Sequence, residues 1–136
     1  MIVTVNKRGE TATYDLPFSI GDIVRVTEYG DRFADQKCTA KHSTFAQKGL
    51  TVNFEHEINK TSYLTCNSKF SSVEWRVVDV GYYLTDSFPR REVVVLLRTR
   101  DKLDMFLVFS NYDRKHGLEI IRKAKKQIEN YTININ

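Results

Sequence analysis

The sequence predicts a mainly β fold of the α+β class: an antiparallel barrel or strongly curled sheet, with an N-terminal hairpin and a C-terminal amphipathic helix. Short runs of β-branched and aromatic residues alternate with polar residues through residues 1–110. Turn-forming residues separate these runs, and after residue 110 the apolar period changes from two to between three and four. A chain of 136 residues suits one domain with one core. We therefore expect a single domain over 1–136, with a β-rich body over 1–110 and a helix and tail over 111–136.

The first part of the chain is typical of a hairpin followed by a third strand. Residues 2–5 are mostly β-branched, and after a turn residues 12–16 alternate between apolar and polar side chains. Proline has no N–H to give to a strand ladder, so Pro17 ends the second strand. Residues 23–27 form a β-branched run between two Gly-Asp turns, which predicts the third strand.

The middle of the chain gives a mixed signal. Residues 50–58 alternate with a period of two, and residues 63–66 would form a short partner strand. Residues 31–48 lack a firm period and are expected to form a long loop or irregular edge strands.

A three-stranded antiparallel meander is predicted over residues 73–109. Residues 93–97 are apolar on both faces, which is typical of a central strand covered on two sides. Gly81 interrupts the preceding strand and indicates a bulge or bend. Trp75, on the same strand, is expected to fill the core.

Residues 114–131 are predicted to form the amphipathic helix. Ser110 and Asp113 resemble a capping box, and apolar residues then recur at steps of three and four. We expect the apolar face to pack on the sheet and the basic face to lie in water. The basic face consists of Lys115, Arg122, Lys123 and Lys126.

The net charge of +4 is unevenly distributed along the chain. Residues 1–110 carry 15 basic and 14 acidic residues, whereas residues 111–136 carry six and three. Further basic groups lie in residues 36–50 and at the pair Arg90-Arg91. The sequence pI of about 9.1 is typical of nucleic-acid-binding domains, in which basic residues neutralise phosphates.

Four residues are candidates for metal or thiol chemistry, and their spacing favours neither. The intervals between Cys38, His42, His56 and Cys66 match no standard zinc motif. Cys38 and His42 could act as nucleophile and base, but no supporting motif surrounds them, so such an enzyme remains only an alternative. The sequence has no nucleotide-binding or calcium-binding motif. We therefore expect no catalytic site, no metal site and no cofactor.

Residues 20–26, Ile-Gly-Asp-Ile-Val-Arg-Val, resemble the opening of SH3-like barrels, including the KOW type found in transcription and ribosome-associated proteins. Residues 75–79, 93–97 and 106–108 resemble the strands that close such a barrel. Small phage-encoded proteins that modify host transcription or defence often look like this. The resemblance implies a barrel and a binding role, and it assigns no functional residues.

The sequence also bears on the compartment. No run approaches the roughly 18 apolar residues of a membrane helix, and the first residues lack the basic start and apolar run of a signal peptide. Because there are also only two cysteines, we expect a protein of a reducing cytoplasm, the host cytoplasm if it is phage-encoded, that binds no membrane. The oligomeric state is not determined by the sequence.

The expected function is binding of nucleic acid without sequence specificity, DNA rather than RNA, in a role that modulates transcription or a defence system. The expected basic contacts are Lys115, Arg122, Lys123 and Lys126 on the helix, and Lys37, Lys41, Arg90 and Arg91 in loops. The expected aromatic contacts are Tyr29, Phe33, Phe45 and Phe88. The alternative is a protein–protein interaction module, or an inhibitor of a cellular enzyme, that uses loop aromatics and a sheet edge.

Overall fold

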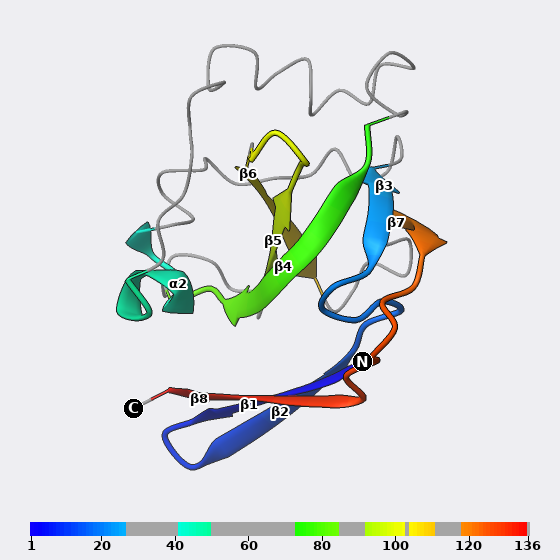
Figure 1. The fold of residues 1–136 in the computed structure, drawn as a ribbon. Coiled ribbons are helices and arrows are strands. Elements are labelled where there is room, and N and C mark those ends of the chain that lie inside the picture. The colour runs from blue at the N-terminus through cyan, green and yellow to red at the C-terminus, as the bar shows by residue number, and fades with distance from the viewer. Residues whose placement is uncertain (27–40, 50–72, 85–91, 103, 111–117, 136) are drawn as a thin grey trace.

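Two β-sheets face each other in the computed structural model, which describes residues 1–26, 41–49, 73–84, 92–102, 104–110 and 118–135 (Figure 1). One sheet has three strands and the other has five. The elements in chain order are β1 (Ile2–Lys7), β2 (Glu10–Asp15), β3 (Ile23–Val26), α2 (Thr44–Gln47), β4 (Trp75–Tyr82), β5 (Glu92–Arg98), β6 (Asp104–Ser110), β7 (Leu118–Arg122) and β8 (Asn130–Ile135).

The three-stranded sheet has the order β2-β1-β8. β1 and β2 form the predicted hairpin around the two-residue turn Arg8-Gly9, whose φ values of 49° and 81° suit the twist of a tight hairpin. β8 pairs with β1 in parallel, from Ile2 opposite Asn130 to Lys7 opposite Ile135. The end of the chain therefore completes the sheet that its beginning starts.

The five-stranded sheet has the order β6-β5-β4-β3-β7, with every neighbouring pair antiparallel. The predicted meander is confirmed as β4-β5-β6. The bulge in β4 lies between Val77 and Asp79 and not at Gly81. The strands confirm the predicted mainly β class. Among the described strands neither sheet closes into a barrel, so the SH3-like barrel stays a prediction.

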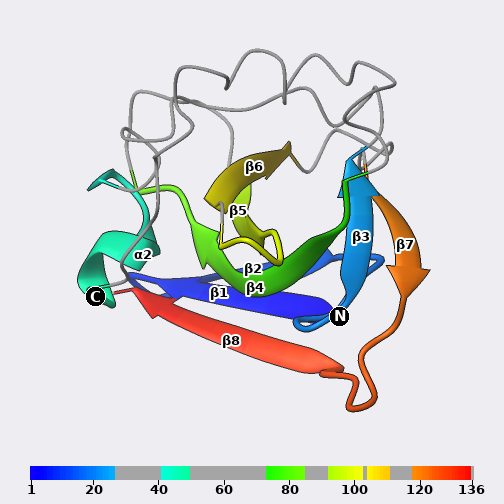
Figure 2. The same ribbon diagram turned by 45° about the horizontal axis from the view of Figure 1, so that its top comes forward.

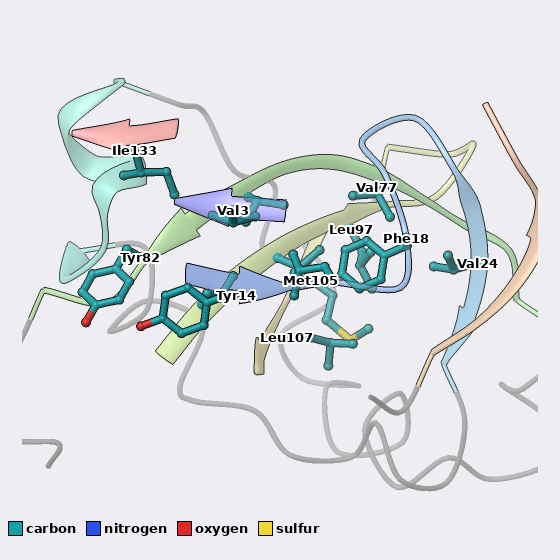
Figure 3. Close-up of a cluster of buried hydrophobic side chains, with 14 of the residues drawn as sticks. Val3, Tyr14, Phe18, Val24, Val77, Tyr82, Leu97, Met105, Leu107 and Ile133 are labelled. Carbon is teal, nitrogen blue, oxygen red and sulfur yellow. The ribbon is translucent and has the colours of Figure 1, made fainter. Parts of the chain in front are cut away.

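The main core lies between the two sheets (Figure 3). It takes Val3 from β1, Trp75 from β4 and the odd-numbered residues of β5 from Val93 to Leu97. The even-numbered residues Val94 and Leu96 are equally buried on the other face of the five-stranded sheet. β5 is thus the central, doubly covered strand that its apolar run predicts, and Trp75, 3% exposed, is a core residue as expected.

The predicted C-terminal helix is wrong. Residues 118–122 form β7, residues 130–135 form β8, and residues 123–129 connect them without helical turns. Within each strand the apolar side chains recur with a period of two: Leu118 and Ile120 face the core from β7, and Ile133 and Ile135 face it from β8. Ala124 is half-buried between the two strands. Its position makes the apolar residues of the whole segment recur at steps of three and four, as they would in a helix.

Gly81 leaves room for α2 on the outer face of the five-stranded sheet. Phe45 of α2 is 1% exposed and packs against Phe106, with the ring centroids 5.3 Å apart and the ring planes tilted by 39°. A Cβ atom at Gly81 would lie 2.7 Å from Thr44 Oγ1 and 2.8 Å from Phe45 Cε2. Contacts this short require α2 to move, so the glycine is required by packing.

We expect Gly81→Ala to lower the free energy of unfolding by about 1–3 kcal/mol, because the added methyl group overpacks this contact. Urea denaturation measures the loss. The Phe45→Ala background, which removes the ring, should reduce the cost of Gly81→Ala. Equal costs in both backgrounds would contradict this account.

Candidate functional site

The connection from β7 to β8 carries the densest positive charge in the described part of the chain. We call residues 122–126, Arg-Lys-Ala-Lys-Lys, the cationic loop. The side chains of Arg122, Lys123, Lys125 and Lys126 are all exposed, whereas Ala124 turns inward. Among the residues that the structure describes, these four cations form no ion pair with a carboxylate. They are therefore available to an external anion.

The backbone of the cationic loop is held by one buried carboxylate. Asp22, 1% exposed, lies between β2 and β3 and accepts a 2.8 Å hydrogen bond from the Ala124 N–H at Oδ1. The same oxygen accepts from Gln127 Nε2 at 2.9 Å, and Oδ2 accepts from the Ser19 N–H at 2.9 Å. Hydrogen bonds to an ionised group are stronger than neutral ones, so the loop is fixed at its centre.

Two further contacts close the other end of the connection. Ser19 Oγ accepts from the Ile128 N–H at 2.9 Å, and the Ile2 N–H donates to the Glu129 carbonyl at 2.8 Å. Gly21, with φ of +97°, lies so close that a Cβ atom there would be 3.0 Å from Ala124 Cβ. Gly21 and Asp22 therefore have two roles: they form the turn before β3, and they hold the β7–β8 connection in place.

The positive surface extends from the loop onto the outer face of the five-stranded sheet. Ile23 of β3 lies opposite Arg76 of β4 on one side and Arg122 of β7 on the other. The Cα atoms of the two arginines are therefore about 10 Å apart across the sheet. Arg76 is exposed, whereas Arg98, the next residue in this row, is held by Asp104 with Nε–Oδ1 and Nη2–Oδ2 distances of 2.6 and 3.1 Å.

Acidic residues also lie near the cationic loop. Glu119 precedes it on β7 and Glu129 follows it, and both side chains are exposed. Residues 118–130 therefore hold four basic and two acidic side chains. The excess remains positive and is concentrated in five consecutive residues.

The structure brings together part of the predicted basic site. Arg122, Lys123 and Lys126 lie in one exposed segment, although that segment is a strand end and a loop rather than a helix face. Lys41 is exposed but precedes α2, and α2 lies away from β7 (Figure 1). The remaining predicted contacts lie outside the described residues: Lys37, Arg90, Arg91, Lys115, Tyr29, Phe33 and Phe88.

Phe45 corrects one predicted aromatic contact. It was expected in an exposed loop, but it is buried against Phe106 and Gly81 and cannot stack on a base or a partner protein. The protein-interaction alternative loses the same residue. Conversely, the prediction omitted Arg76 and Lys125. The alternation of β4 could have found Arg76, because Trp75 and Val77 on either side of it are buried.

A second polar cluster joins α2, β4 and β8. Lys48 Nζ lies 2.8 Å from Asp79 Oδ2 and 2.9 Å from the Tyr131 hydroxyl oxygen, and that hydroxyl donates to Asp79 Oδ1 at 2.8 Å. Burial raises the pKa of Tyr131 and, with the hydrogen bond to Asp79, outweighs the opposing effect of Lys48. Burial lowers the pKa of Lys48, but its bonds to Asp79 and Tyr131 leave that pKa raised. Neither group is activated as a nucleophile, so the cluster is a tie between the sheets.

The described residues offer neither a metal-binding cluster nor a membrane-spanning helix. No group of three or more His, Cys, Asp or Glu side chains there could hold a metal ion. Of the four candidates for metal or thiol chemistry only His42 lies within the described ranges, half-buried before α2; Cys38, His56 and Cys66 do not. No helix in the described ranges has the length and apolar character needed to cross a membrane.

Comparisons with known proteins add no assignment to this geometry. A scan against models of protein families, and searches of the curated proteins and of the solved structures, found no match. The cationic loop and its supports are therefore the features from which a function is inferred.

Removal of the Asp22 carboxylate should release the cationic loop. We expect Asp22→Ala to cost about 2–3 kcal/mol of stability, because it leaves the Ser19 and Ala124 N–H groups without their acceptor. Hydrogen exchange of the Ala124 amide should accelerate strongly. Ser19→Ala is the matched control, since it should accelerate exchange at Ile128 and leave Ala124 protected. Unchanged exchange at Ala124 in Asp22→Ala would contradict the assignment.

The polar cluster should make stability depend on alkaline pH. The folded state favours the protonated forms of Lys48 and Tyr131, because both pKa values are raised. Their contribution is complete below the ordinary pKa values and is lost as the pH rises above about 10. Urea midpoints should therefore fall less steeply with pH in Tyr131→Phe than in the unaltered protein. Parallel pH curves for the two proteins would refute the linkage.

Proposed function

We propose that this protein binds nucleic acid through its phosphate backbone, with the cationic loop as the principal contact. The observation that carries the proposal is the presence of four exposed cations in five consecutive residues, on a backbone fixed by the buried Asp22 carboxylate. DNA is the form we place first, and RNA is compared with it in the test below.

The mechanism is electrostatic. Each phosphate neutralised by a lysine or arginine releases condensed counterions, and this release favours binding at low salt. If all four cations of the loop contact phosphates of a duplex, the logarithm of the affinity should fall with the logarithm of the salt concentration with a slope of about −3.6. Arg76, on the adjacent sheet face, would add to this slope if the nucleic acid follows the outer face.

The anchored loop reduces the conformational cost of binding. A flexible basic tail must be ordered when it binds, whereas the backbone of this loop is already held by bonds to Asp22 at Ala124 and to Ser19 at Ile128. Only the lysine and arginine side chains then lose freedom. The fixed backbone therefore supports a surface that binds as a preformed unit.

The proposed contacts carry little sequence information. Phosphate contacts position a protein on nucleic acid, while base edges specify the sequence. In the described part of the chain the helix α2 spans four residues and directs Phe45 into the interior, so it is not suited to lie in a major groove. We therefore propose binding with weak sequence preference.

Charge reversal in the cationic loop should weaken binding. We expect Arg122→Glu combined with Lys126→Glu to reduce affinity for a labelled DNA duplex by roughly tenfold or more and to lower the salt slope by about 2. Fluorescence anisotropy over a salt series, with DNA and RNA duplexes of one sequence, measures both quantities.

The matched control is Arg8→Glu combined with Arg100→Glu, at exposed positions of the β1–β2 and β5–β6 turns, outside the cationic loop. Both double variants change the net charge equally, so only position differs between them. Equal loss of affinity in the two variants would show that total charge, and not the cationic loop, governs binding. Absence of duplex binding by the unaltered protein at low salt would overturn the proposed function.

A further inference from the structure

β8 presents an open edge in the three-stranded sheet. Among the described strands it pairs on one side alone, with β1, and it runs along the outer margin of the molecule in Figure 2. The backbone N–H and C=O groups on the far side of an edge strand have no ladder partner. Such an edge is a template for another strand unless charge, proline, a bulge or a covering element protects it.

Among the described strands, the edges at β2 and β7 carry such protection, and β8 does not. β2 has Glu10 and Asp15 at its ends, and β7 has Glu119, Arg122 and a register shift against β3. β6 begins with Asp104, but that carboxylate is buried and paired with Arg98. β8 reads Asn-Tyr-Thr-Ile-Asn-Ile, without a charged residue or a proline, and it pairs with β1 over six consecutive rows without a shift. β8 is therefore a regular, uncharged edge that is suited to accept another strand.

We propose that β8 pairs with β8 of a second copy of this chain, joining two three-stranded sheets into one of six strands. A two-fold axis makes the two β8 strands run antiparallel, so each residue must suit the residue that lies opposite it in the second copy. In the register that places Ile133 opposite its own copy, Tyr131 lies opposite Ile135 of the second copy and Thr132 opposite Asn134 of the second copy. Apolar residues then meet apolar ones on the inner face, and uncharged polar residues meet on the outer face.

Charge does not oppose pairing of β8 with a second copy. No like charges oppose each other in this register, because β8 carries none. The strand is also held in place before pairing, since the Tyr131 hydroxyl is bound to Lys48 and Asp79 and the Asn134 side chain accepts from Asn6. Pairing of one strand buries less area than the ~1,200–2,000 Å² of a standard interface, so the dimer should depend on concentration.

The test is analytical ultracentrifugation over a wide concentration range with two matched lysine variants. Thr132 of β8 and Thr13 of β2 are both exposed, and both lie directly opposite Thr4 on the outer face. We expect the unaltered protein and Thr13→Lys to sediment increasingly as dimers as the concentration rises. Thr132→Lys should stay monomeric, because it places a lysine on the pairing edge.

Hydrogen exchange keeps the proposal testable if a variant folds poorly. In the unaltered protein, amides of β8 should become more protected at high concentration than at low concentration, while amides of β2 should not change. A protein that is monomeric at every concentration, or that dimerises equally well with Thr132→Lys, would overturn the proposal. This inference does not rest on nucleic-acid binding, since both measurements are made without nucleic acid.

Discussion

The buried carboxylate of Asp22 connects the two segments that, in the described part of the chain, lead from one sheet to the other. Residues 16–22 lead from β2 to β3, and residues 123–129 lead from β7 to β8, so each segment crosses from one sheet to the other. Asp22 accepts hydrogen bonds from both segments, at the Ser19 and Ala124 N–H groups. The backbone of the cationic loop is held by this contact at Ala124, and the loop leads into β8, which pairs with β1.

The sequence was sufficient for the parts of the fold that local patterns determine. The β1–β2 hairpin follows from alternation around the Arg8-Gly9 turn, and the doubly buried β5 follows from its unbroken apolar run. The C-terminal helix failed because a short window cannot distinguish a helical period from two alternating strands joined by an inward-facing Ala124. The parallel pairing of β1 with β8 joins residues far apart in the chain, and no local pattern specifies such a partner.

The candidate site shows the same division. The sequence identified Arg122, Lys123 and Lys126 because a local excess of positive charge needs no knowledge of the fold. It assigned them to a helix stripe, and it omitted Arg76, which joins them only through the pairing of β3 with both β4 and β7. Phe45 failed for a tertiary reason, since its burial depends on the space left by Gly81, far along the chain. The sequence therefore predicted which residues carry the positive charge, but it did not predict how the fold arranges them.

Amide chemical-shift mapping with a short DNA duplex tests most directly the proposed contact between the cationic loop and the nucleic-acid backbone. The account predicts that the largest shifts fall on residues 122–127, that the hairpin turn at Arg8 is unaffected, and that added salt abolishes the shifts. Shifts centred on another surface, or shifts at the loop that persist at high salt, would contradict it.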